Sequence, residues 1–479
     1  MNTKALRQKV LDLAIHGKLV PQNPNDESAT VLLEKIRAEK AEKIKKGELK
    51  ADKKDSFIFV GSDKRHYEQF ADGTVKDIED EIPFDVPKGW AWCRLKQLSL
   101  DMADGPFGSN LKAEHYTKNK EARIIQLSNI GEYGWREENT KFTTLEHAKN
   151  NISRSIVEPG NLVIAKMMPA GKAIICPNNE KMYVLSSDAV KLVPTSLINS
   201  NYLLNSINSP FFRASVTDNV QGTTRLRTSI SKLRECFFPL PPFAEQERIV
   251  SSIERIFAQI NNLEESKSNL ESVIKQTKSK ILDLAIHGKL VPQDPNDEPA
   301  EELLKRIATS DNRPYEKVEL SEIDWTLPNN WCFCHFWDIA IVINGKNQSK
   351  VENPNGKYPI YGSGGIIGRA DDYICPENCT IIGRKGSINN PILVEEKFWN
   401  VDTAFGLSPS EAVLPRFLFY FCEYFDFTTL DSSTTLPSLT KTNIQQIIFA
   451  LPPIEEQKRI LDKTNELFGK LDEIVLNLI

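Results

Sequence analysis

KVLDLAIHGKLVPQNPNDESA, residues 9–29, returns almost unchanged as KILDLAIHGKLVPQDPNDEPA at residues 280–300, with three differences in 21 positions. A second repeat places LPPFAEQERI at residues 240–249 and LPPIEEQKRI at residues 451–460. A weaker echo pairs VPKGWAW at residues 86–92 with LPNNWCF at residues 327–333. Such similarity at long separation indicates an internal duplication, which determines how the rest of the chain is divided.

The order of the two repeats indicates a circular permutation. In the middle of the chain the LPP unit runs directly into the LDLAIHGKLVP unit, whereas at the ends the two units are separated. With offsets of 211 and 271 residues, Ile479 projects onto position 268 and Met1 onto position 272. We therefore expect the chain ends to meet, to rebuild a second copy of the central element, and to give a pseudo-two-fold molecule.

The central copy has the spacing of a long helix with a coiled-coil seam. Aliphatic residues recur at alternating steps of four and three, and the C-terminal copy continues the pattern. Pro241 and Pro242 stop this helix at one end, and Gly288 and Pro292 stop it at the other. We predict two long antiparallel helices, with seam positions Ile249, Ile253, Ile256, Ile260, Leu263, Leu270, Ile274, Ile281, Ile460, Leu467, Leu471 and Ile474.

Two inserts lie between the helical elements, and each combines short β-type runs with a helical segment. We expect them to be two diverged α+β domains of one type, presented by a shared framework. The predicted divisions are a repeated helical segment that completes the C-terminal helix (1–46), a charged linker (47–82), the first insert (83–240), the central repeated region with the long helix (241–310), a linker (311–326), the second insert (327–450) and the C-terminal repeated helix (451–479).

The whole-chain charge conceals an uneven layout. The 479 residues carry a formal net charge of −5, which alone gives no sign of a nucleic-acid-binding protein. Residues 81–243, however, sum to +5, which suits a DNA backbone, whereas residues 323–450 sum to −4. In the second insert the positive residues still cluster in loops beside Gly, Asn, Thr and Ser, a composition that suits phosphate and base-edge contacts. Clustered loop charges are also commonly just solvated.

Several kinds of chemistry have no motif here. There is no G-x-x-x-x-G-K-[ST] loop for ATP, and Leu240-Pro241-Pro242-Phe243 lacks the polar first residue of an adenine methyltransferase loop. Cys332, Cys334 and His335 with Cys375 and Cys379 have an uncommon spacing for zinc, so buried reduced thiols are the simpler interpretation. His16 and His287 are repeated at helix ends, where capping is favoured over catalysis.

The termini and the hydropathy pattern predict a cytosolic chain. The N-terminal stretch MNTKALRQKVLDLAIHGKLV is amphipathic and charged, unlike an export signal, and no run approaches the length of a membrane span. The eight Cys residues are few and irregularly spaced, as in a reduced compartment. We therefore predict no metal and no membrane contact.

Taken together, these motifs resemble the specificity (S) subunit of a type I restriction–modification system. The resemblance covers essentially the whole chain and rests on the repeats, the two Trp-containing insert openings and the insert motifs GPFGSNLKAEHY (105–116), EPGNLVIAK (158–166), GTTRLRTSISKL (222–233), IIGRKG (381–386) and SSTTLPSLTKTNI (432–444). It implies two α/β target recognition domains, each reading one half of a split double-stranded DNA site, held apart by two antiparallel helices that fix the spacer.

The resemblance also implies partners and DNA contacts. Two modification (M) subunits would bind S-adenosylmethionine and methylate adenine, and two restriction (R) subunits would use ATP and Mg²⁺ for cleavage, while this chain has no catalytic residues and binds no cofactor. The host would be bacterial or archaeal and the location cytoplasmic. The implied DNA contacts are Lys112, Lys166, Lys172, Thr223, Thr224, Arg225 and Arg227 in the first insert, and Lys346, Asn347, Arg384, Lys385, Ser387, Thr434, Thr435, Ser438 and Lys441 in the second.

Two other interpretations stay open on sequence alone. One is the recognition subunit of a type IIB or IIG-like system, in which modification and restriction share one polypeptide. The other is a coiled-coil adaptor that binds proteins and no DNA. A footprint of two DNA blocks separated by an unprotected gap distinguishes a DNA-recognition subunit from the adaptor.

Overall fold

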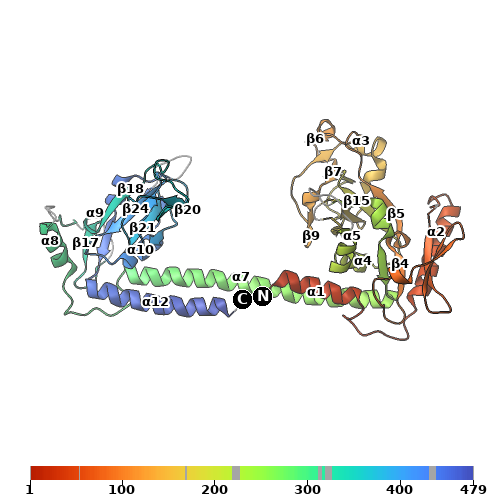
Figure 1. Cartoon of the computed structure of the whole chain (residues 1–479), viewed down its shortest axis with the longest axis horizontal. Helices are drawn as coiled ribbons and strands as arrows, with labels where there is room; N and C mark the ends of the chain where they lie inside the picture. The colour runs from red at the N-terminus through yellow and green to blue at the C-terminus, as the bar shows by residue number, and fades with distance from the viewer. Residues whose placement is uncertain are drawn as a thin grey trace. The chain divides into compact units, whose positions relative to one another are not determined.

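The computed structural model describes residues 2–52, 54–167, 170–217, 227–310, 316–318, 326–430 and 438–477. The chain divides into two compact units, Met1–Glu264 and Glu265–Ile479. The boundary falls within one long helix, α7 (Phe243–Ile286), so that this helix contributes to both units (Figure 1). Each unit therefore contains one insert and one part of the central helix.

In the first unit, helix α1 (Thr3–Ile15) runs antiparallel to the first part of α7 (Figure 1). Near the start of α1, Arg7 bonds to Asn261 at 2.6 Å and to Glu264 at 2.9 Å. Just after the end of α1, Gln22 reaches Glu245 at the start of α7. Val10 and Leu11 are buried against Ile249 and Ile253 in the core of this unit, so the repeated N-terminal segment packs as a helix on α7.

In the second unit, helix α12 (Ile454–Leu476) runs antiparallel to the last part of α7. Gln293, beyond the end of α7, bonds to Glu456 at the start of α12. Farther along, Lys278 pairs with Asp472 at 2.6 Å and lies over the ring of Phe468. The two ends of α7 are thus each covered by a shorter helix from the same unit.

The predicted seam positions are buried to different degrees. Ile249, Ile253, Ile260, Ile274, Ile281 and Ile460 are buried, whereas Ile256, Leu270, Leu467 and Leu471 are partly buried. Leu263 and Ile474 are 49% and 45% exposed. Leu263 lies beside Glu264, which pairs with Arg7 near the start of α1, and Ile474 lies near the end of α12. Burial of the seam is therefore strongest where a second helix covers α7.

The repeated sequence motifs build the same buried polar network in each unit. Trp90 Nε1 donates to Glu245 at 3.1 Å, and Trp331 Nε1 donates to Glu456 at 2.9 Å. Gln22 and Gln293 donate to the other oxygen of the same carboxylates, at 3.2 and 3.1 Å. Beside each network lies an equivalent ion pair, at 2.6 Å in both units: Arg248 with Asp26, and Arg459 with Asp297.

Turn geometry accounts for the rest of the repeated residues. Gly17 and Gly288 both have φ of 65°, a left-handed conformation that ends the preceding helix, and a side chain there would collide with Pro87 or Pro328. The ring nitrogens Nδ1 of His16 and His287 lie 2.7 Å from the backbone oxygens of Asp12 and Asp283. The predicted capping role of the two histidines is thereby confirmed.

The two inserts share one strand topology. Each begins and ends in a two-stranded antiparallel ladder: β4 (Ala91–Arg94) with β16 (Phe237–Leu240), and β17 (Cys332–His335) with β25 (Ile448–Leu451). Each then has a four-stranded antiparallel sheet, of order β13-β12-β15-β5 in the first insert and β22-β21-β24-β18 in the second. The strands are β5 (Ser99–Asp104), β12 (Leu162–Ala165), β13 (Ala173–Ile175), β15 (Ala189–Pro194), β18 (Ala340–Asn344), β21 (Cys379–Gly383), β22 (Ile392–Val394) and β24 (Ala404–Pro409).

A second sheet in each insert contains one parallel pair. In the first insert, β7 (Ala122–Ile125) pairs with β14 (Tyr183–Leu185) within a five-stranded sheet, and in the second, β19 (Tyr358–Gly362) pairs with β23 (Trp399–Asn400) within a three-stranded sheet. The other strands of these second sheets are β6 (Tyr116–Thr117), β10 (Phe142–Thr143), β11 (Ile156–Val157) and β20 (Gly365–Ala370). This shared order agrees with the prediction that the inserts are domains of one type.

Short helices join the inserts to α7 and α12. Tyr202 in α4 (Ser200–Ile207) bonds to the backbone of Pro239, and Asn199 at its cap bonds to Gln246 of α7. In the second insert, α10 (Pro415–Tyr424) takes the same place: the backbone of Leu414 donates to Gln457, and Tyr420 bonds to Asn465 of α12. Gln246 and Gln457, the glutamines of the two repeated Glu-Gln pairs, thus bond each insert to its helix.

The predicted charged linker at residues 47–82 is wrong for much of its length. It contains a three-stranded antiparallel sheet of β1 (Ser56–Val60), β2 (His66–Phe70) and β3 (Val75–Asp77). Glu68 is buried and pairs with Arg94 of β4 at 2.6 Å, which fixes this sheet to the first insert. The charges that suggested a linker lie largely on its exposed face, as Arg65 and Asp77 do. The second predicted linker, 311–326, lies almost wholly outside the described residues.

Candidate nucleic-acid interface

In the first insert, predicted DNA contacts meet where strand β12 ends. Met167 forms an isolated antiparallel bridge with Arg227, and the backbone of Thr228 donates to the oxygen of Lys166 at 2.8 Å. The backbone of Lys166 in turn donates to Asp188, which precedes β15, at 2.8 Å. Lys166 and Arg227 are 61 positions apart in the sequence. Through these contacts they are neighbours at the ends of the strands of the four-stranded sheet.

In the second insert, predicted contacts meet at the end of strand β21. Lys385 forms an isolated bridge with Ser438, and the backbone of Leu439 donates to the oxygen of Arg384 at 2.9 Å. The backbone of Arg384 donates to Thr403, which precedes β24, at 2.8 Å. The loop that carries Lys346 joins the group, because the backbone of Lys346 donates to Asn400 at 2.9 Å.

The two groups are equivalent. Lys166 and Arg384 follow corresponding strands and make the same two backbone hydrogen bonds. The amide of each donates to the residue before the next strand, β15 or β24. The carbonyl of each accepts from the segment before a short helix, α6 (Ile230–Glu235) or α11 (Lys441–Gln445). The opposite strand of the bridge carries Arg227 in one insert and Ser438 in the other. We call these the strand-end sites, defined by Lys166, Met167, Asp188 and Arg227 in the first insert and by Arg384, Lys385, Thr403 and Ser438 in the second.

The cations at and beside the strand-end sites are exposed to different degrees. Arg227 and Lys385 are exposed, and each lies opposite an uncharged bridge partner. Arg384 is half-buried, and its guanidinium lies 5.7 Å from the ring of Phe405. Lys346, Asn347 and Ser387 are exposed beside the second site, and Lys441, half-buried, begins α11 just after it. These groups can serve phosphates and base edges.

Two predicted lysines of the first insert are held inside it by ion pairs. Lys166 pairs with Asp104 at 2.7 Å. Lys172 is 2% exposed and pairs with Glu132. Burial lowers the pKa of Lys172, although the hydrogen bond and charge of Glu132 oppose that shift. In the free subunit Lys172 is therefore not available to a phosphate, which disfavours its predicted role as a direct contact.

The remaining predicted contacts lie elsewhere. Lys112 is exposed in the turn ahead of β6, at the edge of the five-stranded sheet, and its ammonium lies 3.8 Å from Glu114. The structure therefore does not group it with Lys166. The other five, Thr223, Thr224, Arg225, Thr434 and Thr435, lie outside the described residues. The DNA contacts as a set stay predictions.

Two carboxylates of the interface had no signal in the sequence. Asp104 ends strand β5 and Glu132 lies in the turn after Gly131, and both are far along the chain from the lysines that they pair with. Only the strand order brings Asp104 to Lys166, because it places β5 next to β15 and β15 next to β12.

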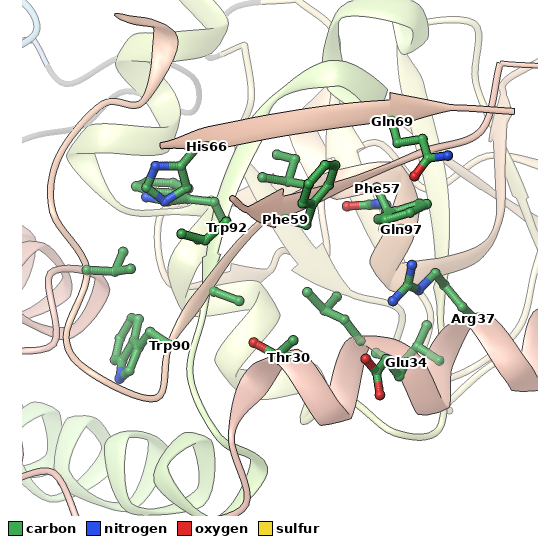
Figure 2. Close-up of a pocket in the computed structure, with 16 residues that line it drawn as sticks. Thr30, Glu34, Arg37, Phe57, Phe59, His66, Gln69, Trp90, Trp92 and Gln97 are labelled. Atoms are coloured by element: carbon green, nitrogen blue, oxygen red, sulfur yellow. The ribbon is translucent and has the colours of Figure 1, made fainter. Parts of the chain in front are cut away.

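A cavity of about 470 Å³ lies apart from these sites, between helix α2 (Ala29–Lys45), strands β1 and β2, and β4 (Figure 2). Its walls are largely aromatic and aliphatic, with Trp90, Trp92 and Phe57 among them. Arg37 from α2 lies over the ring of Phe57 at 4.3 Å. None of the residues that line this cavity belongs to a strand-end site, so it is a feature of the scaffold.

Within the described part of the chain, no group of three or more His, Cys, Asp or Glu side chains is placed to hold a metal ion. All eight Cys residues are buried and remain thiols. Over the same residues, no helix has both the length and the apolar character needed to span a bilayer.

Two inserts of one topology, each with cations gathered at the same strand ends, define a duplicated recognition protein. Residues 110–272 and 328–474 match the family described as type I restriction modification DNA specificity domain. The chain belongs to this family of DNA specificity subunits, and its function is recognition of DNA sequence within a type I restriction–modification system.

Similar proteins agree with this assignment. The chain is 26% identical over 582 aligned positions to the type I restriction enzyme EcoAI specificity subunit of Escherichia coli, with 98% of this chain and 90% of the relative covered. It is 27% identical to the EcoEI specificity subunit of Escherichia coli, with 75% and 66% covered. In fold it is similar to a chain solved in a study of the complex assembly of the type I R-M system, with a TM-score of 0.57, 17% identity and 83% and 94% covered.

Proposed function

We propose that each insert reads one half of a bipartite DNA site through its strand-end site. The observation that carries this proposal is the recurrence of cationic and small polar residues at the same topological place in two otherwise diverged domains. Exposed Arg227 and Lys385 are suited to phosphates or to guanine edges, and Asn347 to adenine. Diverged loops on a common scaffold allow each insert to read a different sequence.

The helices act as a ruler between the two half-sites. We propose that the chain ends meet, so that α12 and α1 together form a partner for α7 and the pair makes an antiparallel coiled coil. The antiparallel contacts of α1 and α12 with the two ends of α7 support this arrangement. The length of the helical pair would then set the number of unread base pairs.

The complex supplies the chemistry. Two modification subunits would dock on the helical scaffold, carry S-adenosylmethionine and methylate adenine, and two restriction subunits would add ATP- and Mg²⁺-dependent cleavage. In this arrangement the chain itself has no catalytic role and binds no cofactor. We place the complex in the bacterial or archaeal cytoplasm, in keeping with curated relatives from Escherichia coli.

Footprinting of the chain with a co-expressed modification subunit tests the recognition proposal. Two short protected blocks separated by an unprotected gap are expected. One continuous footprint, or none, contradicts recognition of a bipartite site.

A length change tests the ruler. One helical turn, about 5.4 Å, is added to α7 at Glu264–Glu265 and to the partner that α12 and α1 form together. This change should widen the tolerated spacer by one or two base pairs. A matched insertion after Gly47, which follows α2 and has open space around it, should leave the spacer unchanged. An unaltered spacer in the helix variant contradicts the ruler.

A further inference from the structure

The cation that ends strand β12 is covered by a carboxylate from strand β5. Lys166 Nζ lies 2.7 Å from Asp104 Oδ1, and the two strands flank β15 in the four-stranded sheet. The Lys166 side chain is 10% exposed and the Asp104 side chain 35% exposed. The carboxylate is therefore the more exposed member of the pair.

The other lysine of the same turn is held in the same way. Lys172 precedes β13, on the far side of the turn from Lys166, and pairs with Glu132. Burial, the largest single effect, disfavours charge on Glu132, but the hydrogen bond from Lys172 and the positive charges of Lys172, Lys4 and Arg213 together outweigh it and lower the pKa of Glu132. Both cations that flank the β12–β13 turn are thus neutralised by carboxylates from other parts of the first insert.

Among the described residues of the second insert, no carboxylate takes this place. The residue after β5 and the residue after β18 are both glycines with the same backbone bond, from Gly105 to Ala189 and from Gly345 to Ala404. Asn344 therefore stands where the first insert has Asp104, and Arg384 stands where it has Lys166. Over the described residues, neither Arg384 nor Lys385 makes an ion pair with a carboxylate. Within the part of the chain that the structure describes, only the first strand-end site pairs its strand-end cation with a carboxylate.

We propose that Asp104 is an electrostatic latch, holding Lys166 in the place that a DNA phosphate takes when the first insert binds its half-site. Carboxylate and phosphate oxygens accept the same charge-assisted hydrogen bonds from an ammonium group, so one can replace the other. The first insert must break this partly buried ion pair before Lys166 engages the DNA backbone, whereas the second insert binds without this exchange. The latch makes the first half-site the more discriminating one against non-cognate DNA. This inference rests on the proposed function.

Reciprocal substitutions test the latch in the complex with the modification subunit. The probe is a 40-base-pair duplex of random sequence, titrated at several salt concentrations. Asp104→Asn should tighten binding by roughly three- to tenfold and steepen the salt dependence by about 0.9 in log K per log salt, the value for one added phosphate contact. Asn344→Asp should weaken binding and reduce the slope by a similar amount, because it adds a latch to the open site.

Asp101→Asn is the matched control. Asp101 lies on the same strand and pairs with Arg154 and Lys191 instead of Lys166, so its loss should leave the salt slope unchanged. A folded Asp104→Asn complex with the parental affinity and slope overturns the latch. If that variant does not fold, the exposed position 344 decides, and an unchanged Asn344→Asp complex overturns the latch. A parental complex that binds no DNA contradicts the proposed function itself.

Discussion

The indole nitrogen of Trp90 donates a hydrogen bond to Glu245 at 3.1 Å, joining residues 155 positions apart. Trp331 and Glu456 repeat the bond at 2.9 Å in the second unit. In each case the Trp comes from the segment that opens an insert, and the Glu comes from the helix that follows or closes it. The bond therefore ties the start of each insert to its end and explains why both motifs recur in the sequence.

Trp90→Phe should destabilise the first unit. The change keeps most of the apolar surface but leaves one oxygen of a buried carboxylate without its donor, at a cost of about 1–3 kcal/mol. Urea unfolding of the full chain, followed by circular dichroism, measures the loss. Trp135→Phe is the control, because the indole of Trp135 donates to the exposed carboxylate of Glu137 and should cost less. Equal losses of unfolding free energy in the two variants would show that the buried network stabilises the fold no more than the exposed bond does.

Gly17→Ala should disrupt the junction after α1. The left-handed backbone at Gly17 costs an L-residue about 1–2 kcal/mol, and a methyl group would also collide with the ring of Pro87. Gly47→Ala separates these two effects, because Gly47 has a similar φ of 75° and open space around it. Thermal unfolding should show a larger loss for Gly17→Ala than for Gly47→Ala. Matching losses would leave backbone strain as the whole cause.

The pH dependence of stability should reveal the buried carboxylates. Burial raises the pKa of Glu245 and of Glu456, despite the hydrogen bonds that oppose the shift. A carboxyl group whose pKa is higher in the folded state binds its proton more tightly there, so it adds stability as pH falls through that pKa toward 4.5 and loses it as pH rises. The parental chain should therefore gain stability relative to Glu245→Gln over that window. A pH-independent difference between the two unfolding curves contradicts this.

Cysteine reactivity should depend on unfolding. All eight thiols are buried, and burial raises the pKa of Cys379 to about 11 and that of Cys176 to about 12. Since the thiolate is the nucleophile, the native chain should resist iodoacetamide at pH 8, whereas the urea-unfolded chain should react at all eight positions. Mass spectrometry counts the modified sites. Rapid labelling of the native chain would show that a thiol is accessible.

The repeats allowed the scaffold to be predicted, because each repeated residue has a definite partner or turn. The pairing of Gln22 with Glu245 and the left-handed turn at Gly17 need those residue types in both copies. The small sheet at residues 56–77 was missed, because its short strands carry exposed charges that hide the alternation of buried and exposed positions. The site was predicted in part: loop composition indicated Arg384 and the family resemblance implied Lys166, but only the strand order reveals that Asp104 pairs with Lys166.

Lys385→Ala and Arg227→Ala should weaken DNA binding at different half-sites. Each removes the exposed cation of one strand-end bridge, so each should reduce the salt dependence of binding by about 0.9 in log K per log salt if the side chain contacts a phosphate. Footprinting of the complex with the modification subunit should show weaker protection of one block for Lys385→Ala and of the other for Arg227→Ala. Arg416→Ala is the matched control, because Arg416 lies on α10 and pairs with Glu395 outside the strand-end site. Equal weakening of both blocks by either variant would contradict the assignment of one half-site to each insert.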